Sequence, residues 1–328
     1  MSDEQKFADL VFEGGGVKGI GLAGAFAALE AGGFTPKRVA GASAGAITAA
    51  LVAVGYTADE LHEVLGTVPF ASFKDKGWED RLPGAGPALS VLLDRGIYEG
   101  RVFEEWMAEK LAAKGIETFG ELRAKQADPA GGAPLSVIVS DVTDHRMLVL
   151  PDDAAHLGVN PDELNIAYAV RMSMSIPIFF EPVVHKNPSD GREHVIVDGG
   201  MLSNYPVWLF DSKGKPPRWP TFGLKLVEPD PTVQIGERLT SSGGDGIVHY
   251  VRSLAETMME AHDRLYVEKA NFARTIPIPT LGVGTTEFDI TPERVEALYQ
   301  SGYEAAQQFL ATWDFSAYID EFRTADSA

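Results

Sequence analysis

Cysteine is absent from all 328 residues of the chain. Its absence excludes disulfide bonds, thiol nucleophiles and metal sites with cysteine ligands. Positive charge is also scarce, because 28 lysines and arginines face 47 acidic residues and give a formal net charge of −19. This deficit disfavours nucleic acid as a partner and disfavours electrostatic recruitment to an anionic membrane. An apolar patch could still dock on lipid, so peripheral membrane contact stays open.

Long uninterrupted apolar runs are missing as well. The longest candidate, residues 40–58, is broken by Gly41, Gly45 and Gly55, which is typical of a core helix rather than a membrane span. Residues 1–6 are polar and acidic and do not resemble a secretory signal. The composition, 45% hydrophobic and 23% charged, is that of a globular protein. We therefore expect a cytoplasmic protein with at most peripheral contact to a membrane.

Apolar strands and helices alternate in the N-terminal part of the chain. A strand at residues 7–12 and a helix at 20–31 are followed by a strand at 38–40 and a helix at 44–54. This order is typical of an α/β fold, a mostly parallel sheet with helices on its faces. The remaining pattern predicts strands at 135–139, 147–150, 195–197, 221–227 and 275–283, and helices at 103–111, 165–175, 246–273 and 292–310.

A serine stands where the second strand passes into the second helix. Gly41, Ser43 and Gly45 form the pattern G-x-S-x-G, in which a serine is held on a sharp turn between a strand and a helix. The turn brings the backbone on its two sides close together, so the flanking positions must be small. Ser43 would lie at a helix N-terminus, where backbone N–H groups favour developing negative charge. The competing interpretation is a serine that only caps the helix.

A run of glycines, Gly14, Gly15 and Gly16, joins the first strand to the first helix. Without side chains, successive N–H groups can form a nest that binds an anion. The run also matches the dinucleotide fingerprint through Gly14, Gly16 and Gly19. That fingerprint needs an acidic residue at the end of the second strand, where Gly41 stands instead. A ligand-free tight turn remains the simpler alternative.

A nucleophilic serine needs a base, and Asp198 is the best-placed candidate. It ends a buried strand, and Gly199 and Gly200 leave its carboxylate open to a neighbour. An isolated Asp-Gly-Gly is otherwise typical of a tight turn. None of the seven histidines lies in a glycine-framed loop after a strand; they are His62, His145, His156, His185, His194, His249 and His262.

Three stretches together resemble the patatin-like phospholipases: residues 14–19, 41–45 and 198–200. The likeness covers residues 8–210 and extends to three further stretches: residues 118–119, residues 171–182, and Asn204 with Pro206. It implies a three-layer α/β/α sandwich. We expect one domain over residues 7–313, with core motifs at 8–210, a C-terminal strand and helices at 220–313, and a tail at 314–328.

The resemblance also implies a Ser–Asp dyad, with Ser43 as the nucleophile and Asp198 as the base. Gly14, Gly15 and Gly16, with the N–H of Ala44, are the implied oxyanion hole. The other motif positions, Lys18, Gly19, Gly41, Gly45, Gly199 and Gly200, would support these loops. Lys18 stands where the family often has arginine, which puts an anion contact by that side chain in doubt.

The implied activity is hydrolysis of fatty acyl esters of phospholipids or lysophospholipids, without a cofactor or metal ion. Residues 68–70 and 178–180 could line an acyl channel, although such segments are more often core. Two alternatives stay open: an α/β-hydrolase with a histidine triad, and a lipid-binding module without catalysis. The sequence leaves the oligomeric state undetermined.

Overall fold

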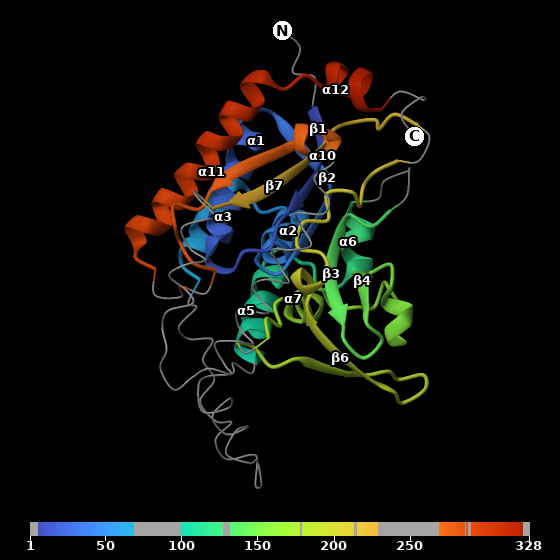
Figure 1. Ribbon diagram of the computed structural model, residues 1–328. Helices are drawn as coiled ribbons and strands as arrows, with labels where there is room; N and C mark the ends of the chain where they lie inside the picture. The colour runs from blue at the N-terminus through green and yellow to red at the C-terminus, as the bar shows by residue number, and fades with distance from the viewer. Residues whose placement is uncertain are drawn as a thin grey trace, which may run out of the picture.

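The computed structural model describes residues 6–68, 100–126, 132–177, 179–212, 215–228, 269–285, 287 and 290–323 (Figure 1). The predicted helix at 246–273 lies mostly outside these ranges, and so do Pro69, Phe70 and Ile178 of the two predicted channel segments.

One mixed sheet forms the centre of the fold. Its strand order is β5-β6-β3-β2-β1-β7-β8, and β4 pairs with β3 off this path. The strands β3, β2, β1, β7 and β8 are parallel, whereas β4 and β6 are antiparallel to β3, and β5 is antiparallel to β6. The bounds are β1 Lys6–Phe12, β2 Phe34–Ala42, β3 Leu135–Asp141, β4 Arg146–Leu150, β5 Val183–Lys186, β6 Glu193–Asp198, β7 Thr221–Val227 and β8 Thr275–Pro279.

Helices and loops bury the two faces of this sheet. The helices are α1 Ile20–Ala31, α2 Ala44–Val54, α3 Ala58–Gly66, α5 Arg101–Ala112, α6 Phe119–Lys125, α7 Ile166–Ser173, α10 Lys269–Ala273, α11 Pro292–Thr312 and α12 Phe315–Phe322. Short 3₁₀ turns are η1 Gly16–Gly19, η3 Ala154–Leu157 and η4 Gly199–Met201.

Alternate residues of the central strands point to different cores. Leu10 and Phe12 belong to the large core that α1, α2 and α11 help to form, and Val11 and Ala40 pack instead against a smaller cluster that includes Tyr205. This alternation follows from the twofold period of a strand. The mostly parallel sheet with helices on both sides confirms the predicted α/β fold class.

The helices that follow the glycine loop and Ser43 lie where the sequence predicts them. The predicted helices at residues 20–31 and 44–54 coincide with α1 and α2. At the last long helix, the Thr291 side chain accepts a hydrogen bond from the N–H of Arg294, and Pro292 occupies the first turn. Prolines in β8 are consistent with its place at the edge of the sheet.

One boundary differs from the prediction. Residues 314–328 were expected to be a tail, but residues 315–322 form α12. The side chain of Asp314 caps this helix by accepting from the N–H of Ala317, 2.9 Å away. The Arg323 guanidinium then donates to Asp211, which ties the end of α12 to the segment that follows Asp198 and the two glycines after it. In the ranges above, none of the helices has the length and hydropathy of a transmembrane span.

Candidate active site

Ser43 sits on a strained turn between β2 and α2. Its backbone dihedrals are φ 53° and ψ −130°, and a positive φ is unfavourable for a residue with a side chain. The flanking glycines are required by close backbone contacts. A Cβ atom on Gly41 would lie 2.3 Å from the carbonyl of Gly45, and one on Gly45 would lie 2.2 Å from the carbonyl oxygen of Phe12. The predicted reason for the G-x-S-x-G spacing is therefore confirmed.

The sheet brings Ser43 and Asp198 together from strands far apart in the chain. In the register of β3, Ala42 pairs with Ile138 and Asp198 pairs with Val139. One edge of β3 is occupied by β4, which pairs with residues 137–141. The same residues also pair with β2 (137 and 138) or with β6 (139–141), so β2 and β6 lie end to end along the other edge of β3. The two strands run toward each other along this edge. Their C-terminal ends, and with them Ser43 and Asp198, meet at neighbouring residues of β3.

The carboxyl group of Asp198 is fully buried and only half satisfied. Its Oδ1 accepts a hydrogen bond of 2.7 Å from the N–H of Gly200, while Oδ2 has no hydrogen-bond partner in the described part of the chain. Burial raises the pKa of Asp198 to about 7, although the Ser43 hydroxyl and the Gly200 N–H act in the opposite direction. A carboxyl group with this pKa is half ionised at neutral pH, which suits a general base.

Two serines, Ser173 at the end of α7 and Ser175 just after it, contact the backbone of the pair. The Ser43 N–H donates to Ser173 Oγ at 2.9 Å, and the Asp198 N–H donates to the carbonyl of Ser175 at 3.0 Å. Buried Arg171 donates to Ser175 Oγ at 2.6 Å. In this structure the Ser43 hydroxyl faces Met174 Sδ at 3.7 Å, which accepts only weakly. In the sequence, this segment stood out only because residues 171–182 resemble the family. The structure shows that it contacts both Ser43 and Asp198.

The glycine loop presents N–H groups beside the serine. No hydrogen bond from the N–H groups of Gly15, Gly16 or Ala44 is formed within the described ranges. Gly14 differs from the prediction, because its N–H donates to the backbone carbonyl of Asn204 at 3.1 Å. The candidate oxyanion hole in this structure therefore comprises three N–H groups rather than four.

The side chain of Lys18 does not face this loop as a free cation. Its Nζ lies 2.8 Å from Glu228 Oε1, and both side chains are largely buried. Gly19 packs against the turn that carries Ser43, since a Cβ atom on Gly19 would lie 3.1 Å from the Cβ of Ala44. Lys18 and Gly19 thus fix the loop rather than offer a ligand contact.

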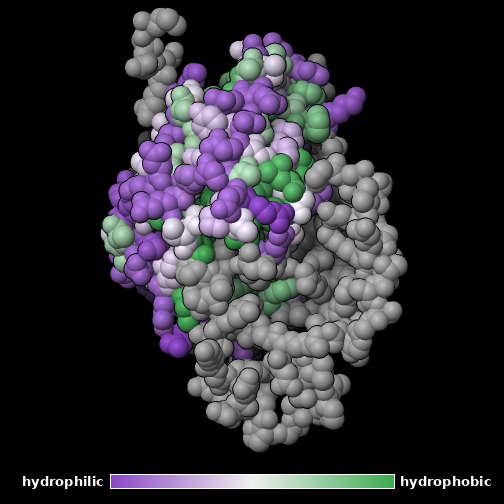
Figure 2. Space-filling model, turned by 90° about the vertical axis from the view of Figure 1, so that its left-hand side faces the viewer, coloured by the Kyte–Doolittle hydropathy of each residue, from purple (hydrophilic) through white to green (hydrophobic). Residues whose placement is uncertain are grey.

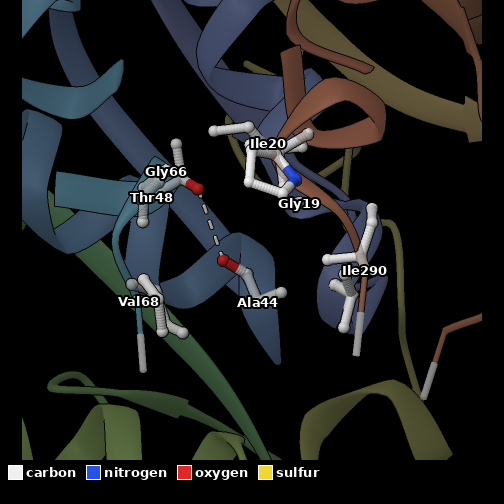
Figure 3. A pocket seen from close by; sticks show the side chains of 13 residues that line it. Gly19, Ile20, Ala44, Thr48, Gly66, Val68 and Ile290 are labelled. Atoms are coloured by element: carbon white, nitrogen blue, oxygen red, sulfur yellow. Dashed lines mark hydrogen bonds between the residues drawn. The ribbon is translucent and has the colours of Figure 1, made fainter. Parts of the chain in front are cut away.

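An apolar cavity of about 130 Å³ opens beside the glycine loop and the elbow. Gly16, Gly19 and Ala44 form one side of it. Figure 3 shows apolar side chains around the same space, together with the 3.4 Å hydrogen bond from Thr48 to the Ala44 carbonyl. The apolar lining consists of Val17, Ile20, Ile47, Leu65, Val68, Ile290, Pro292 and Val295.

The two predicted channel segments have different surroundings. Val68 lines the cavity described above. Phe180 is buried instead, with its ring 6.5 Å from that of Phe103 and 5.6 Å from the guanidinium of Arg171. Phe180 therefore belongs to the core, and partly buried Phe179 packs against that core.

No histidine in the described ranges is hydrogen-bonded to Ser43. His62 contacts Glu296 at 2.9 Å, and His185 contacts the Tyr168 hydroxyl at 3.1 Å. His156 and His194 belong to a separate cluster with two aspartates, Asp141 and Asp144. His249 and His262 lie outside the described residues.

A strained serine elbow, a buried aspartate and a glycine loop on an α/β sandwich are the features of a serine acyl hydrolase. Comparison with known proteins agrees. The family model described as patatin-like phospholipase matches residues 10–211. The chain belongs to this family, and it is a lipid acyl hydrolase.

Three relatives illustrate the likeness. "Uncharacterized protein YqhO" of Bacillus subtilis (strain 168) is 39% identical over 312 residues, which cover 94% of this chain and 100% of that protein. The structure of VipD from Legionella pneumophila has a TM-score of 0.56 at 22% identity, over 94% of this chain and 67% of VipD. A complex of SpcU with ExoU of Pseudomonas aeruginosa gives 0.50 at 18% identity, over 93% of this chain and 52% of the matched chain. The two solved structures support the fold only.

Proposed function

We propose that this protein hydrolyses fatty acyl esters of phospholipids or lysophospholipids with Ser43 and Asp198 as a catalytic dyad. The observation that carries the proposal is the meeting of β2 and β6 on one edge of β3. That meeting brings Ser43 close to a buried carboxylate whose Oδ2 accepts no hydrogen bond from the described residues.

The reaction begins with proton transfer from Ser43 Oγ to Asp198 as the oxygen attacks the ester carbonyl carbon. The carbonyl oxygen becomes negatively charged, and the N–H groups of Gly15, Gly16 and Ala44 stabilise it. When the tetrahedral intermediate collapses, the bond to the leaving alcohol breaks and Asp198 returns the proton to that alcohol. The acyl group is then esterified to Ser43.

Hydrolysis of the acyl-enzyme uses the same groups in reverse order. Asp198 takes a proton from a water molecule, whose oxygen attacks the acyl carbon. The second tetrahedral intermediate expels Ser43 Oγ, which regains its proton from Asp198. The products are a free fatty acid and the resting enzyme. No step requires a redox partner or a metal ion.

The cavity beside Ala44 supports an acyl chain as the apolar part of the substrate. Its lining is almost entirely aliphatic, and its volume of about 130 Å³ is small beside the roughly 300–1,000 Å³ of a site for a whole drug-sized ligand. It therefore suits a segment of one acyl chain.

We further propose that the enzyme is cytoplasmic and meets lipid as a peripheral protein. On the side of the molecule seen in Figure 2, apolar areas lie between polar side chains.

A double-mutant cycle on purified protein tests the dyad. Ser43→Ala and Asp198→Asn should each remove most of the turnover of acyl esters, and the double variant should be little worse than either, since the two groups act as a unit. Ser212→Ala, an exposed serine outside the site, is the matched control. Multiplying losses, or full activity in Asp198→Asn, would reject the dyad.

The same panel of esters distinguishes the alternatives. A histidine triad predicts that one histidine is indispensable while Asp198→Asn stays active. A lipid-binding module predicts binding to lipid vesicles without turnover of any ester by the wild-type protein.

A further inference from the structure

Four side chains outside the candidate active site converge on one point. They are Asp141 at the end of β3, Asp144 in the turn to β4, His156 in η3 and His194 in β6. One ligand atom from each lies within 4.8 Å of all the others. The four residues span a long stretch of sequence and show no metal-binding motif along the chain, so only the fold brings them together.

The spacing of these atoms fits a single small cation. Asp141 Oδ2 lies 2.8 Å from His194 Nδ1 and 3.2 Å from His156 Nε2. Asp144 Oδ2 lies 3.0 Å from His156 Nε2 and 3.8 Å from His194 Nδ1. In a tetrahedral site with bonds of about 2.0–2.1 Å, neighbouring ligand atoms are separated by about 3.3 Å. Little rearrangement would be needed to place an ion at the centre.

Each carboxylate has its second oxygen engaged away from the centre. Asp141 Oδ1 accepts from the N–H groups of Thr143 and Asp144 at 2.9 and 3.2 Å. Asp144 Oδ1 accepts from the guanidinium of Arg192. These outer contacts orient the two Oδ2 atoms inward, as outer hydrogen bonds do for metal ligands.

Burial makes a cation at this point favourable. The side chains of Asp141 and His194 are almost entirely shielded from solvent, and those of Asp144 and His156 are only about a fifth exposed. Two carboxylate oxygens so close together in a buried site repel each other unless positive charge lies between them. Two carboxylates with two neutral imidazoles offset the charge of a divalent ion, and the Arg192 guanidinium beside Asp144 adds one positive charge outside the four ligands.

We propose that Asp141, Asp144, His156 and His194 form a structural site for a divalent transition-metal ion, with Zn²⁺ as the best match. Two imidazole nitrogens with two carboxylate oxygens suit Zn²⁺ better than Ca²⁺ or Mg²⁺, which prefer sites built from oxygen. Four protein ligands complete a tetrahedron and leave no position for substrate. The ion would fasten the turn after β3 to β6 and would take no part in hydrolysis.

The site lies on the same strand pair that positions Asp198. Asp141 pairs with Ile196, and two residues further along the same strands Val139 pairs with Asp198. A metal ion would therefore stabilise the pairing of β3 with β6, on which the candidate dyad depends.

Metal titration of the full-length protein tests this proposal. Protein stripped with EDTA and freed of chelator is titrated with Zn²⁺ by calorimetry and with Co²⁺ by visible absorption. We expect one equivalent of each ion to bind, intense Co²⁺ bands typical of tetrahedral coordination, and a rise in Tm of about 5 °C or more at saturating Zn²⁺.

Two variants at partly exposed ligands locate the site. His156→Gln and Asp144→Asn should each lose the stoichiometric binding and the Co²⁺ bands, and their Tm should no longer respond to Zn²⁺. His62→Gln, which removes a histidine paired with Glu296 elsewhere, should behave as wild type. Wild-type protein that binds neither ion, or variants that bind both as wild type does, would overturn the proposal and leave an ordinary cluster of ion pairs.

Discussion

Asn204 holds Gly14 through two hydrogen bonds in opposite directions. The Gly14 N–H donates to the Asn204 backbone carbonyl at 3.1 Å, and the Asn204 side-chain amide donates back to the Gly14 carbonyl at 3.0 Å. The two segments are 190 residues apart in the chain. Because Asn204 follows Asp198 closely, this contact ties the glycine loop to the segment that carries the candidate base.

We predict that Asn204→Ala lowers kcat more than it changes KM. Without the amide, the buried Gly14 carbonyl loses its donor and the loop is less well fixed, so the oxyanion donors shift from their positions. The expected loss in kcat is roughly tenfold or more. Steady-state kinetics together with thermal melting check it, and Asn160→Ala in an exposed loop is the control. Unchanged kcat in a folded Asn204→Ala protein would contradict the positioning role.

Gly15→Ala is predicted to slow ester turnover with little effect on folding. Its φ of −170° is open to any residue, but a Cβ atom there would lie 2.1 Å from Leu226 Cδ1, so that flexible side chain or the loop itself must shift. Displacing one oxyanion donor costs about a hundred- to a thousand-fold in turnover. Ester turnover and Tm should be measured on the same preparation of Gly15→Ala. Turnover close to that of wild type would exclude Gly15 from the oxyanion hole.

Gly16→Ala is a harsher change at the neighbouring position and serves as the comparison for Gly15→Ala. The φ of Gly16 is +57°, and a Cβ atom would lie 2.0 Å from the Thr285 carbonyl oxygen. Backbone strain and this clash should lower Tm as well as turnover. A Tm close to wild type in Gly16→Ala would show that the loop is looser than its contacts indicate.

The activity should rise with pH through a single step near pH 7. Burial raises the pKa of the Asp198 carboxyl to about 7, and only its ionised form can accept the Ser43 proton. The acid limb of kcat/KM, measured with a neutral substrate, should therefore have an apparent pKa near 7. A limb that falls instead near pH 4 would mean that the base is an ordinary exposed carboxylate.

The free energy of unfolding should fall as pH rises, whereas activity rises, because both depend on the ionisation of Asp198. Its pKa is about 7 when folded and 3.8 in the reference state, so between these values the folded protein retains a proton that the unfolded chain loses. Stability therefore falls as pH rises from about 4 to about 7, by on the order of a few kcal/mol. Asp198→Asn removes this cost.

The measurement compares wild type with Asp198→Asn by denaturant unfolding at two pH values. The variant should be the more stable protein at pH 8, and its advantage should shrink toward pH 4. An advantage that does not depend on pH would show that the buried carboxyl is not the source.

Hydrolysis should continue after treatment with EDTA. The candidate dyad needs no metal ion, and the metal site proposed at Asp141, Asp144, His156 and His194 would be structural and lies outside the dyad. Activity assayed well below Tm should therefore remain close to that of the untreated protein. Loss of activity that calcium restores would overturn this expectation.

Local sequence was sufficient for much of the fold and for the candidate residues. Strand and helix periodicity predicted α1 and α2 to the residue, and the glycines around Ser43 predicted the elbow. These features are local, because a sharp turn restricts only the residues within a few positions of it. The aspartate was found in the same way, from a strand that ends in two glycines.

Contacts between distant segments were decided only by the tertiary structure. The meeting of Ser43 with Asp198 depends on the register of β2 and β6 against β3, and no local pattern sets that register. The same holds for the bond that removes the Gly14 N–H from the oxyanion hole, and for the cluster around Asp141. The sequence determined which side chains are available for chemistry. The pairing of strands determined which of them meet, because it fixes the direction and depth of every side chain along the sheet.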